Sequence, residues 1–358
     1  MSHRQTLVRV VDRERPDPNT IREAASCLRR GGLVVFPTET VYGLGAHALD
    51  ADAVAGIFAA KGRPASDPLI VHVASAAHLD AIARTVPPLA TTLAAQFWPG
   101  PLTMILPKRT IVPAAVTAGL DTVAVRVPSH PVALALLIAA GIPVAAPSAN
   151  LFSRPSPTQA SHVLADLDGR IDMVLDAGPT DIGVESTVLD LAANPPTVRR
   201  PGGVSVEALR ALMPDLAVVS RVAAAGEAQV APGQLLRHYA PRARLTLVTG
   251  PMPAACRWVA VNAVEASERG RRIGVLAPAE DLAFLAEGGR GHRLSRGIVM
   301  RPYGSRRRPE QSARELFAVV KSRKVRISIN QTYPLREAAQ AQRDLEERKT
   351  TGSTVLIP

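Results

Sequence analysis

Apolar residues between positions 20 and 200 occur in short runs that predict strands separated by helices. The runs are four or five residues long and are mostly bounded by glycine, proline or aspartate, as is typical of buried strands. We expect strands at Leu33–Phe36, Leu69–Val73, Leu102–Leu106, Val123–Val127 and Met173–Asp176, continued by Val188–Leu191 and Val198.

Helices are expected where apolar residues recur every three or four positions. The first begins after Asn19 and Thr20, which can cap it, and its apolar positions include Ile21, Ala24 and Leu28. Helices that alternate with strands favour a mixed α/β domain. Further helical runs lie near Ala51–Ala60, Ala76–Thr85, Val132–Ala140 and Gln159–Leu164.

The pattern changes in the second part of the chain. Val222–Val230 is rich in alanine and poor in large apolar residues, which predicts a linker. Strand-like Leu245–Val248 and Arg272–Leu276 follow, with a helix near Ser312–Phe317. No G-x-G-x-x-G sequence follows either strand, so the pattern gives no support for nucleotide binding by this second part.

Length and composition indicate a globular protein of two domains. A chain of 358 residues is long for one core, and its 47% of hydrophobic residues is typical of folded proteins. No run of eighteen uncharged apolar residues is present and residues 1–15 are polar, so we expect neither a membrane span nor a signal peptide. Cys27 and Cys256 are far apart and lack partners at ligand spacing, which predicts no disulfide, no zinc site and a cytoplasmic location.

The net charge of +11 is unevenly distributed. Residues 1–210 carry 18 basic and 18 acidic side chains, whereas residues 211–358 carry 24 and 13. A basic second half can attract phosphate backbones, double-stranded RNA among them, or can simply be an arginine-rich solvated surface. Aromatic residues make up 3% of the chain and provide few surfaces for base stacking. Weak RNA contact therefore stays an alternative.

The most informative polar residues follow the first predicted strand. Phe36–Gly45 reads FPTETVYGLG, Lys61–Pro64 reads KGRP, and Asp67–His72 reads DPLIVH. A hydroxyl-rich turn after a strand, followed by two cations and a histidine, is typical of a site for small anions. Arg126, at the end of another predicted strand, can bind a carboxylate through two parallel hydrogen bonds.

These segments resemble the YrdC-like threonylcarbamoyl-adenylate synthases. The resemblance continues, in the family's order, through Trp98–Thr103, Ala118–Arg126, Ala146–Asn150 and Gly183–Thr187. It implies a YrdC-like twisted mixed sheet with helices in residues 1–210. It also implies the two-domain form, with a linker or lid at 211–242 and a smaller Rossmann-like α/β domain at 243–317. The linker resembles that of the longer members, except that Gln234 replaces their usual methionine.

The resemblance implies an enzyme that joins L-threonine, bicarbonate and ATP, supplied with Mg²⁺, into threonylcarbamoyl-adenylate and pyrophosphate. The product would serve threonylcarbamoyladenosine modification of tRNA through a downstream transferase complex. Lys61 and Arg63 are the expected catalytic residues, and no metal ligand is assigned. The resemblance assigns L-threonine to Thr40, His72, Arg126, Ala146 and Ser186. It assigns ATP to Lys61, Arg63, Asp67, Thr122, Ser148, Ser156, Arg200 and Tyr239.

Two features depart from the family pattern. Asp67 stands where the family usually has asparagine, and a carboxylate near a triphosphate repels it unless Mg²⁺ bridges the two. The tail, residues 318–358, resembles the C-terminal end of quinone oxidoreductases from Val319 onward but lacks their nicotinamide-binding segment. We therefore expect a fusion that brings no redox activity.

Two other functions share features with this chain. One is an RNA-binding or ribosome-associated module without catalysis, which the balanced charge of residues 1–210 disfavours. The other is a carbamoyltransferase of the hydrogenase-maturation type, whose zinc-finger segments need more than the two cysteines present. The motifs of P-loop, zincin and α/β-hydrolase enzymes are absent from the sequence.

Overall fold

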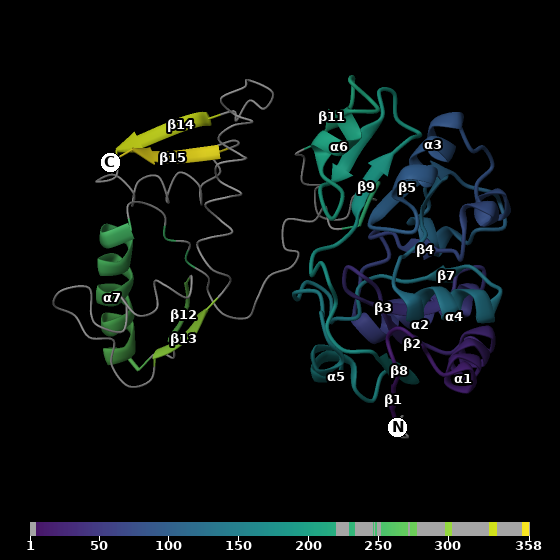
Figure 1. The fold of residues 1–358 in the computed structure, drawn as a ribbon, viewed down its shortest axis with the longest axis horizontal. Coiled ribbons are helices and arrows are strands. Elements are labelled where there is room, and N and C mark those ends of the chain that lie inside the picture. Colours follow the sequence, from purple (N-terminus) through teal and green to yellow (C-terminus); the bar gives the residue numbers. More distant parts are fainter. Residues whose placement is uncertain are drawn as a thin grey trace. The chain divides into compact units, whose positions relative to one another are not determined.

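The computed structural model describes residues 5–219, 229–232, 246, 248, 252–270, 273–277, 298–302, 329–334 and 353–357. The chain forms two compact units, Met1–Arg244 and Leu245–Pro358, and each is described by itself (Figure 1). In the part of the chain that the structure describes, no helix is both long and apolar enough to cross a membrane.

The first unit is built on an eleven-stranded mixed sheet, with strand order β1-β8-β2-β3-β7-β4-β6-β5-β9-β10-β11. Its apolar runs form strands near the positions that their composition predicts. The strands are β1 (Leu7–Val10), β2 (Val34–Pro37), β3 (Tyr42–His47), β4 (Ile70–His72), β5 (Leu102–Pro107), β6 (Thr122–Arg126), β7 (Val144–Ala145), β8 (Met173–Asp176), β9 (Thr187–Asp190), β10 (Thr197–Arg200) and β11 (Ala217–Val218).

Helices lie on both faces of this sheet. Among the described residues of this unit, six are α-helices: α1 (Pro18–Arg29), α2 (Ala51–Lys61), α3 (Pro88–Phe97), α4 (Pro131–Ala140), α5 (Ala160–Leu167) and α6 (Val206–Arg210). Two are 3₁₀ helices, η1 (Ala76–Ala81) and η2 (Ala114–Thr117).

Two local expectations need correction. Helix α1 is capped by Asp17, whose carboxylate accepts a hydrogen bond from the Thr20 N–H at 2.9 Å, and not by Asn19 and Thr20. The helix expected at Ala76–Thr85 is the short 3₁₀ helix η1. Its bonds span three residues, as from the His78 N–H to the Ser75 carbonyl at 3.2 Å.

The two faces of the sheet pack into separate cores. Val34 and Phe36 of β2 pack with α1 and α4, whereas Val35 between them faces the larger core that includes residues of α2, α3 and α5. This alternation follows from the two-residue period of a strand. A third, smaller core lies around Ile70 and Ala231. Among the described residues, the larger core covers one face of the sheet, and the two smaller cores lie on the other.

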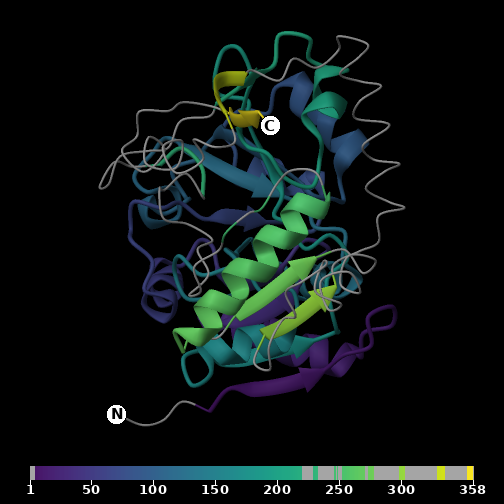
Figure 2. The same ribbon diagram turned by 90° about the vertical axis from the view of Figure 1, so that its left-hand side faces the viewer.

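In the second unit, α7 (Met252–Glu268) lies along the parallel pair β12 (Ile273–Ala277) and β13 (Ile298–Pro302), as Figure 2 shows. Strands β14 (Ile329–Pro334) and β15 (Ser353–Ile357) form a second parallel pair. The helix expected near Ser312–Phe317 lies outside the described residues. The Rossmann-like form of this region and the division of the chain at residues 210, 242 and 317 stay predictions.

Candidate active site

The pocket is built on two neighbouring strands. Strands β4 and β6 are parallel, and their register places His72 beside Arg126. Val71 and Val125, one residue earlier on each strand, are buried in the larger core. Because successive side chains on a strand alternate between faces, His72 and Arg126 must point to the other face. Two polar side chains are thereby brought together in the middle of the sheet.

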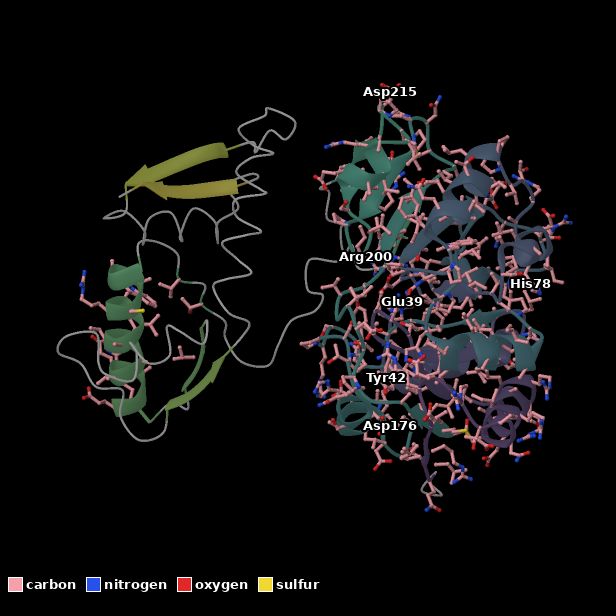
Figure 3. All side chains as sticks on the ribbon, viewed as in Figure 1. Glu39, Tyr42, His78, Asp176, Arg200 and Asp215 are labelled. Carbon is pink, nitrogen blue, oxygen red and sulfur yellow. The ribbon has the colours of Figure 1, made fainter. Side chains whose placement is uncertain are left out.

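The turn after β2 closes around Arg126. The Thr38 hydroxyl donates to the Val41 carbonyl at 2.6 Å and lies 2.8 Å from the Thr40 hydroxyl. Arg126 donates from its Nη1 to the Thr40 hydroxyl at 3.0 Å and from its Nη2 to a Glu39 carboxylate oxygen at 2.6 Å. The Glu39 side chain, labelled in Figure 3, is buried. The hydroxyl-rich turn therefore also holds the charge partner of Arg126.

Burial shifts both strand residues toward their neutral forms. It lowers the pKa of His72 to about 3, and the nearby charge of Arg126 contributes to the shift. His72 is therefore neutral near pH 7, and its buried Nδ1 has no hydrogen-bond partner among the described residues. Burial also lowers the pKa of Arg126, although Glu39 opposes the shift. Arg126 remains a cation because the pKa of an arginine is ordinarily above 12.

Lys61 holds the segment that carries Ser148, which lines the pocket. It is the last residue of α2, and Gly62 then adopts a left-handed conformation (φ 62°) that ends the helix. The Lys61 ammonium is buried and donates to the carbonyls of Ser148 and Asn150, the latter at 2.6 Å. Burial, and after it the charge of Arg63, holds the pKa of Lys61 well below its usual value. Lys61 thus anchors the segment that carries Ser148.

Arg63 extends into the pocket, whereas its partner Asp67 is fully buried. The Arg63 guanidinium lies 2.9 Å from the Asp67 carboxylate. It also donates to the carbonyls of Asp67 at 3.1 Å and Pro68 at 2.7 Å. The family resemblance gives Lys61 and Arg63 a shared catalytic role. However, the helix end at Gly62 separates them, so that only Arg63 lines the pocket.

Arg200 approaches from β10 and closes the opposite side. Its Nη2 donates to the Ser186 carbonyl at 2.9 Å and to the Ser186 hydroxyl at 3.2 Å. The Ser186 hydroxyl also lies 2.8 Å from that of Thr103. Nη1 of Arg200 donates to the Pro232 carbonyl at 3.4 Å, so the short segment 229–232 adjoins the site.

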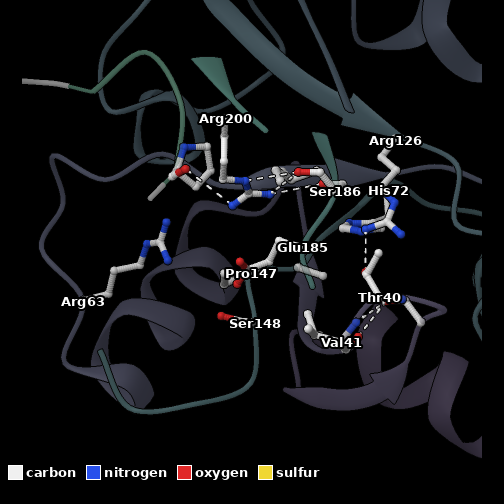
Figure 4. Close-up of a pocket in the computed structure, with 15 residues that line it drawn as sticks. Thr40, Val41, Arg63, His72, Arg126, Pro147, Ser148, Glu185, Ser186 and Arg200 are labelled. Atoms are coloured by element: carbon white, nitrogen blue, oxygen red, sulfur yellow. Dashed lines mark hydrogen bonds between the residues drawn. The ribbon is translucent and has the colours of Figure 1, made fainter. Parts of the chain in front are cut away.

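Most of these residues line one pocket, drawn in Figure 4. Eight of the residues expected from the sequence are among those that line it: Thr40, Arg63, His72, Arg126, Ala146, Ser148, Ser186 and Arg200. Seven further residues complete the lining: Thr38, Val41, Gly43, Ile70, Pro147, Glu185 and Pro232.

Five expected residues are not among the lining. Lys61 and Asp67 are buried, and they bind Asn150 and Arg63 respectively. Thr122 stands four residues before Arg126 on β6, opposite Pro107, and so about 13 Å from the pocket end of that strand. Ser156 donates its hydroxyl to the Glu185 carboxylate. Tyr239 lies outside the described residues.

Sequence reasoning did not single out Glu185 or Glu39. Glu185 directly precedes Ser186, and the resemblance assigns a substrate only to Ser186. Glu39 stands between Thr38 and Thr40, and the resemblance assigns L-threonine to Thr40. In each case the available signal was a lone carboxylate inside a polar motif. Neither residue's partner, Ser156 or Arg126, is near it in the sequence.

Comparison with known proteins matches both parts of the chain. Residues 26–202 match the family model of Sua5, YciO and YrdC proteins, described as telomere recombination. Residues 204–344 match the model described as threonylcarbamoyl-AMP synthase, C-terminal domain.

Two similar curated proteins are both called threonylcarbamoyl-AMP synthase. The protein from Pyrococcus abyssi is 48% identical over 280 residues, which cover 77% of this chain and 82% of the relative. The protein from Bacillus subtilis is 46% identical over 281 residues, which cover 78% and 80%.

Two solved structures resemble the chain. P. abyssi Sua5 complexed with L-threonine has a TM-score of 0.73 at 43% identity, and the match covers 82% of this chain and 92% of that one. Escherichia coli YciO has a TM-score of 0.52 at 26% identity, covering 57% of this chain and 98% of the other.

Proposed function

Because the chain belongs to the threonylcarbamoyl-AMP synthase family, we propose that it forms threonylcarbamoyl-AMP and pyrophosphate from L-threonine, bicarbonate and ATP. It is an enzyme of the nucleotidyltransferase type. Membership confirms the resemblance drawn from the sequence motifs, and the likeness to the Sua5 structure confirms the mixed α/β fold. The resemblance of the tail to quinone oxidoreductases finds no support, and the second family match extends into the tail as far as residue 344.

The observation that carries this proposal is the division of the pocket into two parts. His72, Arg126 and Ser186 lie at one end of it and Arg63 and Ser148 at the other, as Figure 4 shows. A guanidinium beside hydroxyl groups suits a carboxylate, and a second guanidinium beside a serine suits phosphate oxygens. One pocket can then hold an amino acid against a nucleotide, which the formation of a mixed anhydride requires.

Arg126 is the proposed partner of the threonine carboxylate. Three of its five N–H groups donate hydrogen bonds to Gly100, Thr40 and Glu39, and these bonds fix its orientation. The remaining donors are available to a ligand. Because its protein contacts already hold the guanidinium in place, little side-chain entropy is lost when a carboxylate binds.

Arg63 and Arg200 are the proposed partners of ATP, which enters as its Mg²⁺ complex. In the reaction, the threonine amine forms a C–N bond with bicarbonate, and water is lost. An oxygen of the resulting carbamate then bonds to the α-phosphorus, and the bond to pyrophosphate breaks. Fixed cations beside the developing pyrophosphate charge stabilise it without reorganisation. Among the described residues, no group of three or more His, Cys, Asp or Glu could hold a metal ion.

The threonylcarbamoyl-AMP would next serve threonylcarbamoyladenosine modification of tRNA, through a separate transferase complex. We propose a cytoplasmic location for this step because tRNA is the final acceptor. Contact with RNA by the basic second half of the chain remains an additional proposal, supported only by its charge.

The test is to incubate the full chain with ATP, Mg²⁺ and bicarbonate, with and without L-threonine. Mass spectrometry would follow the adenylate, and a coupled assay would follow pyrophosphate. We expect pyrophosphate release that depends on threonine, together with a threonylcarbamoyl-AMP peak. A folded protein that binds ATP but forms neither product would refute the proposed activity and favour the RNA-binding alternative.

A further inference from the structure

Glu185 places a carboxylate in the pocket, and its charge opposes the lowering of the Lys61 pKa by burial. Its Oε1 accepts a hydrogen bond from the Ser156 hydroxyl, and its backbone carbonyl accepts one from the Gly203 N–H at 2.9 Å. Among the described residues, no Lys, Arg or His forms an ion pair with it. Figure 4 shows Glu185 near the centre of the pocket, between Arg200 and Pro147.

The other charges of the pocket make this carboxylate unusual. Arg63, Arg126 and Arg200 supply three guanidinium groups, and Glu185 is the one acidic residue in the lining. The carboxylates of Asp67 and Glu39 are buried against Arg63 and Arg126, at 2.9 and 2.6 Å. Asp67 and Glu39 therefore form ion pairs within the protein, and Glu185 lines the pocket where a ligand would bind.

A zwitterionic amino acid needs one acceptor for its ammonium group as well as donors for its carboxylate. An ammonium ion removed from water without an acceptor is strongly disfavoured. The neutral acceptors nearby are partly used, since the Thr40 hydroxyl accepts from Arg126 and the Ser186 hydroxyl from Arg200, which leaves each oxygen at most one further lone pair. Hydrogen bonds between two charged groups are also about twice as strong as neutral ones.

We propose that the Glu185 carboxylate binds the α-ammonium group of L-threonine and so selects amino acids over acids that lack the amine. This inference rests on the proposed function, because it names the residue that recognises one end of that substrate. Ser156 acts as a positioning residue, since its hydroxyl holds the Glu185 carboxylate from one side. The role expected for Ser156, contact with ATP, is replaced in this proposal by contact with Glu185.

Calorimetric titration of the full chain without ATP or Mg²⁺ tests the proposal. The two ligands are L-threonine and 3-hydroxybutyrate, which keeps the carboxylate and hydroxyl but lacks the amine. The variants are Glu185→Gln and, as a matched control, Glu207→Gln at an exposed site on α6. We expect Glu185→Gln to weaken threonine binding about 10- to 100-fold, as for loss of a hydrogen bond between charged groups, and to leave 3-hydroxybutyrate binding unchanged.

The outcomes separate this inference from the proposed function. Failure of the unaltered chain to bind threonine would overturn both. Threonine binding that Glu185→Gln leaves intact, or equal losses for both ligands, would overturn the role of Glu185 alone. An effect confined to ATP affinity in the presence of Mg²⁺ would also overturn it, because the carboxylate would then serve the metal-bound triphosphate. If Glu185→Gln does not fold, Glu185→Asp, which retracts the charge by one methylene, should show the same selective loss.

Discussion

His72 and Arg126 lie side by side on the parallel strands β4 and β6, in direct register. Both are almost fully buried, at 3% and 4% exposure, and the histidine has no acidic partner among the described residues. A neutral imidazole next to a guanidinium is the stable arrangement, because two buried cations side by side would repel each other. This pairing gives the protein a specific sensitivity to acid.

We expect His72 to destabilise the protein as the pH falls from about 6.5 to about 3. The unfolded chain takes up a proton near pH 6.5, whereas in the folded protein the pKa of His72 is about 3. Protonation in that interval therefore favours unfolding, by up to about 1.4 kcal/mol per pH unit. Denaturant unfolding at a series of pH values should show a shallower loss for His72→Gln. The exposed control His78→Gln should keep the original slope; identical slopes for all three proteins would contradict this account.

The buried pair of Arg126 and Glu39 is expected to contribute to both stability and substrate binding. Glu39→Gln leaves Arg126 without its charge partner, which should lower the free energy of unfolding by about 3 kcal/mol. The KM for L-threonine should rise more than kcat falls, because Arg126 loses its orientation. The exposed pair Arg9 and Glu23 provides the control, since Glu23→Gln should cost less than about 1 kcal/mol. Equal effects of the two substitutions would argue against the role of Glu39.

Lys61 is expected to act through the segment that carries Ser148. Lys61→Met removes the donor to the carbonyls of Ser148 and Asn150, which should lower the free energy of unfolding by about 1–3 kcal/mol. The affinity for ATP should fall with it. Lys108→Met, at a half-buried lysine outside the pocket lining, should leave ATP affinity unchanged. Loss of ATP affinity at unchanged stability would show that Lys61 contacts the nucleotide directly, as the sequence resemblance implies.

Asp67 is expected to be tolerant of the asparagine that the family usually carries there. The substitution Asp67→Asn removes a negative charge beside the pocket, while the carbonyls of Asp67 and Pro68 still hold Arg63. ATP affinity at low Mg²⁺ should therefore stay equal or increase. Asp52→Asn makes the same charge change at the other end of α2 and should have no effect on ATP. A large loss for Asp67→Asn alone would identify its carboxylate as a Mg²⁺ ligand.

The residues of the pocket could be anticipated from the sequence only where a motif coincides with a strand end. Thr40, His72, Arg126 and Ser148 are expected because the family resemblance assigns them to substrates, and each also lies in or just after a short apolar run. The resemblance also assigns Thr122, on the same strand as Arg126, to ATP. A strand rises about 3.3 Å per residue, however, and four residues carry Thr122 away from the pocket.

The sequence by itself determined the family, the α/β class and the approximate strands, because apolar periodicity and motif order are properties of neighbouring residues. The tertiary structure decided which charged groups face the pocket. Lys61, Asp67 and Glu39 bind Ser148, Arg63 and Arg126, whereas Glu185 lines the pocket. Such pairings join residues from distant strands and turns. They depend on strand register and on the free-energy cost of burying an unpaired charge. Neither can be predicted from a local sequence pattern.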